Sequence, residues 1–104
     1  MKSINAQELK ELFEDKINFT LLDVREKEEL DMAKINPHTH IPMGEITERL
    51  SELNKDMPIV VMCHSGVRSA RVCNYLTDHG YNVKNLMGGI NSWSIDIDPT
   101  VPQY

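Results

Sequence analysis

A chain of 104 residues, 40% hydrophobic and 26% charged, has the size and composition of one globular domain. This composition argues against a disordered, fibrous or membrane protein, so we expect a single domain over residues 1–104. Sixteen acidic against eleven basic residues give a net charge of −5, which argues against a broad basic face that binds nucleic acid. No stretch resembles a secretory signal or a membrane span, so we expect no membrane partner and a cytoplasmic location, with Cys63 and Cys73 reduced.

The first half of the chain begins with a helix and a strand. Asn5 is a good N-cap for a helix through Phe13, whose apolar residues share one face. Residues 19–24 are apolar, partly β-branched and too few for a helix, which predicts a buried strand with polar Asp23 and Arg25 at its end. Three further elements are expected in this half: an acidic helix over 26–33, turns with a very short extended segment over 36–42, and a helix over 44–53.

The second half contains the clearest strand pattern. Residues 59–62 are continuously apolar, which is typical of a strand covered on both faces of a parallel sheet, and Cys63 stands at its carboxyl end. A helix is expected from Val67 to His79, where Gly80 ends it. Two elements complete the chain: a short strand over 83–87 and, after Gly88 and Gly89, a helix through Trp93.

Strands and helices therefore alternate along the chain, which predicts an α/β sheet with helices on both faces. Ligands of such sheets bind beyond the carboxyl ends of the strands. Asp23 and Cys63 both fall at such ends, so this edge of the sheet is the candidate site.

The segment after Cys63 has the composition of an anion-binding loop. If the helix begins near Val67, the loop turns backbone N–H groups inward and the helix adds partial positive charge. Gly66 permits a close backbone approach, and Ser65 and Ser69 offer hydroxyl groups. Arg68 can add a full positive charge. Such surroundings lower the pKa of a thiol and favour a nucleophile, whereas the alternative is a small buried cysteine that only closes the strand.

Three motifs carry a family resemblance. The active-site loop of the rhodanese family has the pattern Cys, two residues, Gly, one residue, Arg, Ser, which resembles the run Cys63-His64-Ser65-Gly66-Val67-Arg68-Ser69. Its N-terminal signature and its closing Gly-Gly…Trp segment are similar to Leu21-Leu22-Asp23-Val24-Arg25-Glu26 and Gly88-Gly89-Ile90-Asn91-Ser92-Trp93. The resemblance extends over nearly the whole chain and implies a three-layer α/β fold with a five-stranded, mainly parallel sheet flanked by helices.

The resemblance also implies a reaction. The Cys63 thiolate would be catalytic, taking the outer sulfur of a donor as a persulfide and passing it to a thiophilic acceptor. The small anionic donor would be bound by His64, Ser65, Gly66, Val67, Arg68 and Ser69. Asp23 and Arg25 would support this loop. The acceptor would be cyanide in an assay and a thiol or a sulfur-carrier protein in the cell, and no metal or cofactor is implied. Thiosulfate-active members often carry a basic residue where this chain has His64, so the donor stays open between thiosulfate and a persulfide.

Three other functions are compatible with parts of this sequence. Dual-specificity phosphatases of the same fold place five residues between Cys and Arg, whereas four separate Cys63 from Arg68. A non-catalytic interaction module is the main alternative, and the presence of Cys63, Gly66 and Arg68 argues against it. A redox sensor would need Cys73 as a resolving thiol, but helical spacing directs Cys73 to the core.

Several other residues are expected to serve the fold. His38 and His40 have no partners at zinc-site spacing, so we interpret them as ordinary loop or strand residues. Trp93 is expected in the core, and residues 97–104 are expected to pack against the domain.

Overall fold

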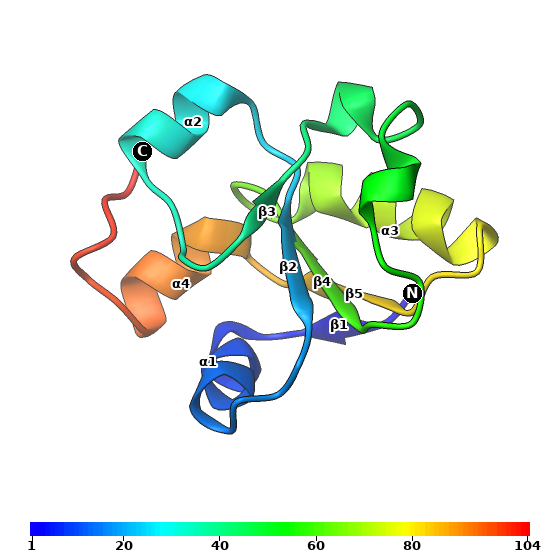
Figure 1. Cartoon of the computed structure of the whole chain (residues 1–104). Helices are drawn as coiled ribbons and strands as arrows, with labels where there is room; N and C mark the ends of the chain where they lie inside the picture. The colour runs from blue at the N-terminus through cyan, green and yellow to red at the C-terminus, as the bar shows by residue number, and fades with distance from the viewer.

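The computed structural model describes all residues, 1–104. Five parallel strands form one sheet in the order β1-β5-β4-β2-β3, flanked by four helices (Figure 1). The strands are β1 Ser3–Ile4, β2 Thr20–Asp23, β3 Thr39–His40, β4 Ile59–Met62 and β5 Val83–Leu86. The helices are α1 Ala6–Glu14, α2 Lys27–Met32, α3 Val67–Asp78 and α4 Gly89–Asp96. None of them combines the length and apolar character needed to cross a lipid bilayer.

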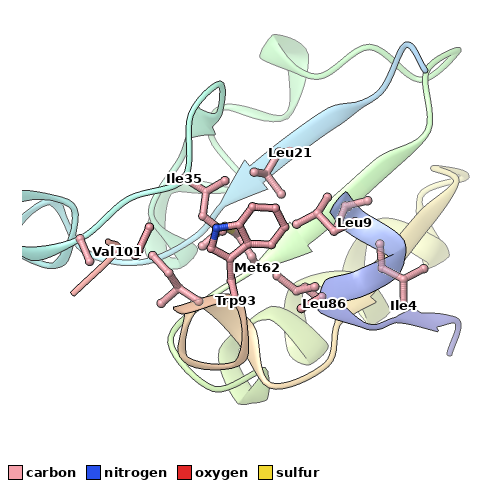
Figure 2. Close-up of a cluster of buried hydrophobic side chains, with 12 residues drawn as sticks. Ile4, Leu9, Leu21, Ile35, Met62, Leu86, Trp93 and Val101 are labelled. Carbon is pink, nitrogen blue, oxygen red and sulfur yellow. The ribbon is translucent and has the colours of Figure 1, made fainter. Parts of the chain in front are cut away.

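Both faces of the sheet are covered, as the continuous apolar strand predicted. Successive side chains of a strand point to opposite faces, so Val60 and Met62 of β4 join one core cluster while Ile59 and Val61 join another. The first cluster is closed by α1 and α4 and the second by α3 (Figure 1). Trp93 of α4 lies within the first cluster, as expected (Figure 2). The predicted three-layer α/β fold is confirmed.

The register of the central strands places the candidate site. Asp23, the last residue of β2, pairs with Met62, the last residue of β4. The backbone N–H of Val24 then donates to the Met62 carbonyl at 3.1 Å, which extends the pairing beyond the strands. Asp23 and Cys63 therefore leave neighbouring strands at the same carboxyl edge.

Two local predictions differ from the structure. The helix expected over 44–53 is wrong: two 3-10 turns, Met43–Glu45 and Leu50–Glu52, occupy this stretch. Their hydrogen bonds span three residues, and Arg49, with φ −111°, interrupts the helical path between them. The apolar side was predicted correctly, because Ile46 and Leu53 are buried against the second cluster. The edge strand β1 was missed, since its two residues are too few to show an alternating pattern.

Candidate functional site

The thiol of Cys63 lies at the carboxyl end of β4, in the turn that leads into α3. The residue is only 1% exposed. Its Sγ accepts a hydrogen bond from the backbone N–H of Gly66 at 3.1 Å and a longer one from that of Ser69 at 3.5 Å. The Ser69 hydroxyl lies 3.3 Å from the same sulfur. The loop thus surrounds Sγ with donors, as the sequence predicted.

Two glycines give the loop its shape. Gly66 has φ 104°, a backbone conformation that side chains with a Cβ rarely adopt, and it precedes the first residue of α3. A Cβ on Gly89 would overlap the carbonyl oxygens of Cys63 and His64. The start of α4 can therefore approach the loop, where the Ile90 N–H donates to the Cys63 carbonyl at 3.0 Å. The Gly-Gly motif holds the far side of the loop.

The two cysteines have opposite electrostatic surroundings. Burial alone raises the pKa of Cys63, but hydrogen bonds from the Ser69 side chain and from the N–H groups of Ser69, Gly66 and Ser65 outweigh it, so the pKa is lowered. Burial and the charge of Cys63 raise the pKa of Cys73 to about 12. Cys73 is fully buried on α3, as predicted. Thiolate character is thus concentrated at Cys63.

Asn85, which was not predicted from the sequence as a site residue, accepts the hydrogen bond of the Ser69 hydroxyl. This side chain of β5 is 6% exposed, and its Oδ1 accepts a hydrogen bond from Ser69 Oγ at 2.5 Å. Its Nδ2 donates to the Gly66 carbonyl at 3.1 Å, which fixes the orientation of the amide. Ser69 has one hydroxyl proton and two acceptors, Asn85 Oδ1 and Cys63 Sγ. The backbone N–H groups are therefore the donors that always remain with the sulfur.

Arg68 was predicted in the first turn of α3 with no direction for its side chain. Both terminal nitrogens of its guanidinium bind the carboxylate of Glu29 on α2, at 2.5 and 2.8 Å. The hydrogen bonds from Arg68 are the largest reason that the pKa of Glu29 falls to about 2. The Glu29 hydrogen bond raises the pKa of Arg68, and the charge of Cys63 adds to this effect. Arg68 is therefore an ion-paired cation within electrostatic reach of the thiolate.

Asp23 and Arg25 form a completely buried ion pair. Arg25 Nη2 lies 2.7 Å from Asp23 Oδ2, and Nε lies 3.0 Å from Oδ1. The same Nη2 donates to the carbonyl of Ala33, and Nη1 donates to that of Glu29, so the pair fixes the turn around α2. The sequence predicted the pair as loop support, and neither residue contacts Cys63 through a hydrogen bond.

The rim of the loop includes a contact that the sequence did not predict. The imidazole of His64 stacks on the ring of Tyr104, with centroids 4.1 Å apart and planes 12° apart. Ser65 and Val67 are exposed at the same rim. Glu29, Asn85 and Tyr104 were missed because each comes from a different element and no local spacing links them to Cys63.

The two other candidate histidines each contact a backbone carbonyl. His38 Nδ1 lies 2.9 Å from the Ile35 oxygen, and His40 Nε2 lies 2.7 Å from the Arg25 oxygen. These contacts fit the interpretation that they serve the loop and the edge strand.

Comparison with known proteins places this loop in a family. The profile of the family described as Rhodanese-like domain matches residues 5–96. The chain belongs to the rhodanese-like family. It is 39% identical to the candidate sulfurtransferase YtwF of Bacillus subtilis, over 95% of this chain and 96% of that protein. It is 36% identical to a sulfurtransferase of Allochromatium vinosum, over 90% and 89% of the two chains. The crystal structure of a rhodanese-like domain protein from Staphylococcus aureus superposes with a TM-score of 0.88 at 35% identity, covering 100% of this chain and 99% of that one.

Proposed function

We propose that this rhodanese-like protein is a sulfurtransferase that moves sulfane sulfur from thiosulfate or a persulfide donor to a thiophilic acceptor through a persulfide on Cys63. The observation that carries the proposal is the cradle of backbone N–H groups around Cys63 Sγ, which lowers the pKa of the thiol at the end of β4. The sulfurtransferase names of two relatives of similar length support it.

The reaction balances without an oxidant or a metal. The Cys63 thiolate attacks the outer sulfur of thiosulfate, a new S–S bond forms, and sulfite leaves with the electron pair of the bond that breaks. The nucleophilic acceptor then attacks the outer sulfur of the persulfide. The Cys63 thiolate leaves and is ready for the next donor, so the kinetics are ping-pong.

Each loop residue has a role in this scheme. The N–H groups of residues 64–69 stabilise the anionic persulfide as they stabilise the thiolate, and Gly66 permits the backbone turn that aims them. Arg68 adds positive charge for an anionic donor, and the carboxylate of Glu29 offsets part of its electrostatic attraction. Asp23 and Arg25 hold the neighbouring turn. The exposed rim residues Ser65 and Val67 leave room for a larger acceptor, either a thiol or a sulfur-carrier protein.

The structure gives the redox-sensor alternative little support. A resolving thiol must itself ionise to attack an oxidised Cys63, and the pKa of Cys73 is raised to about 12. We therefore propose that Cys73 fills the core and takes no part in the reaction.

The test is transfer of sulfur from thiosulfate, and separately from a small persulfide, to cyanide, with thiocyanate as the product. Wild type and Cys73→Ser are expected to turn over, and Cys63→Ser is expected to be inactive with every donor. Folded wild type that forms no thiocyanate from either donor would favour the non-catalytic module instead.

A further inference from the structure

Tyr104 joins the end of the chain to the candidate active site. The last segment of the chain runs back from α4 to lie against α2 (Figure 1). Val101 is buried in the first core cluster, which anchors this segment. Tyr104 is partly buried and contacts three residues that come from separate parts of the chain: Arg25, Glu29 and His64.

The phenol of Tyr104 has a defined hydrogen-bond direction. It accepts from Arg25 Nη1 at 2.8 Å, and it donates to Glu29 Oε2 at 2.7 Å. Burial is the main reason that the pKa of Tyr104 rises to about 12, so the phenol keeps the proton that it donates. A single chain of hydrogen bonds therefore links the buried Arg25, through Tyr104, to the carboxylate that holds Arg68.

The carboxylate of Glu29 is fixed from several sides. Its Oε2 accepts from both Tyr104 and Arg68, and its Oε1 accepts from Arg68 and from the Glu26 N–H at 3.2 Å. The Glu29 side chain is only 15% exposed, so water replaces a lost donor poorly. Removal of the phenol oxygen would leave Arg68 paired with a less constrained carboxylate.

We propose that Tyr104 is a positioning residue for the Cys63 loop. Its hydroxyl fixes Glu29 and, through it, Arg68, and its ring stacks on the imidazole of His64 and fixes the orientation of that side chain. The positioned Arg68 gives Cys63 a preference for anionic reagents over neutral ones of the same shape. This inference deepens the proposed function, because it assigns the anion preference of the donor step to a contact made by the tail.

Alkylation tests the proposal without requiring sulfur transfer. Iodoacetate and iodoacetamide react with a thiolate in the same way: the C–S bond forms, the C–I bond breaks and iodide leaves. The first reagent is an anion and the second is neutral. The ratio of their rates at Cys63, followed by intact mass on the full chain, therefore reports the electrostatic environment of the Cys63 thiolate. The raised pKa keeps Cys73 protonated near neutral pH, and Cys63→Ser identifies any reaction there.

The variants separate the positioning of Arg68 from a general change in the stability of the protein. Tyr104→Phe keeps the ring that stacks on His64 and removes only the hydroxyl. Tyr81→Phe is the matched control, since it removes a phenol that contacts the Leu50 carbonyl at 3.4 Å, outside the Arg68 network. We expect Arg68→Gln to lower the iodoacetate-to-iodoacetamide ratio about threefold, the size of a unit-charge effect across a partly screened distance, and Tyr104→Phe, which leaves Arg68 charged but less well positioned, to lower it by a smaller factor. The double variant should fall no further than Arg68→Gln alone, because Tyr104 acts on the ratio through Arg68.

A second readout follows the carboxylate itself. Loss of a donor to Glu29 raises its pKa, so the carboxyl ¹³C resonance of Glu29 should titrate at higher pH in Tyr104→Phe than in wild type. An unchanged rate ratio with an unchanged Glu29 titration would overturn the proposal, as would additive effects of Tyr104→Phe and Arg68→Gln. Because neither readout depends on sulfur transfer, these results stand apart from the outcome of the thiocyanate assay.

Discussion

Replacing Ser69 by alanine separates the two kinds of donor that surround Cys63. The variant keeps the backbone N–H 3.5 Å from the sulfur and removes only the hydroxyl at 3.3 Å. Ser69 is fully buried, so water is not expected to take the place of the hydroxyl.

The magnitude follows from competition for one proton. A hydrogen bond to a charged group is worth about 1.5–3 kcal/mol and a neutral one about 1 kcal/mol. When Cys63 ionises, the hydroxyl turns to the sulfur and gives up its bond to Asn85 Oδ1, 2.5 Å away. The net contribution to the thiolate is then about 1 kcal/mol, so Ser69→Ala should hold about fivefold less thiolate at a pH below the pKa of Cys63.

The assay is the rate of iodoacetamide alkylation of Cys63 as a function of pH, followed by intact mass. The midpoint of the profile should move to higher pH in Ser69→Ala. Ser65→Ala is the matched control, because Ser65 acts on Cys63 through its backbone N–H, which alanine retains. A Ser69→Ala profile that overlays wild type, or moves to lower pH, would show that the hydroxyl proton stays with Asn85.

Three other substitutions test the scaffold around the loop. Asp23→Asn leaves the charge of Arg25 buried and unpaired, so urea unfolding should show a loss of about 3–5 kcal/mol, and a loss below about 1 kcal/mol would contradict the buried ion pair. Gly89→Ala places a Cβ on the Cys63 carbonyl and should slow alkylation of the thiol at pH 7 relative to wild type; an unchanged rate would show that the loop does not depend on this close approach. Glu29→Gln removes a carboxylate whose pKa falls from 4.5 to about 2 on folding, so its stabilisation is present above about pH 5 and is lost as pH falls towards 2. The difference in unfolding free energy between wild type and Glu29→Gln should shrink over this range, and a difference independent of pH would refute the assignment.

The sequence predicted the features of the fold that local patterns encode. The apolar run of β4, the helix from Val67 and the Gly-Gly motif each carry their information within a few neighbouring residues. The helix predicted over 44–53 was wrong because the helical spacing of Ile46, Leu50 and Leu53 also suits two 3-10 turns. These turns bury largely the same apolar side.

The same distinction between local patterns and contacts of distant segments applies to the candidate site. The loop from Cys63 to Ser69 is one contiguous motif, and the burial of Cys73 follows from helical spacing. The contacts that determine the electrostatic environment of the site join distant segments. Arg68 binds Glu29, 39 residues earlier, and Tyr104 donates a hydrogen bond to the same glutamate, 75 residues earlier. No periodicity connects such positions, so only the folded chain shows that the positive charge of Arg68 is already paired.

Intact-mass measurement of the reduced protein after brief exposure to thiosulfate or a small persulfide tests the central proposal most directly. The persulfide mechanism predicts a gain of one sulfur atom on Cys63, its removal by cyanide, the same behaviour in Cys73→Ser, and no gain in Cys63→Ser. A folded protein with a reactive Cys63 thiolate that acquires no sulfur from either donor, or that acquires it equally in Cys63→Ser, would contradict it.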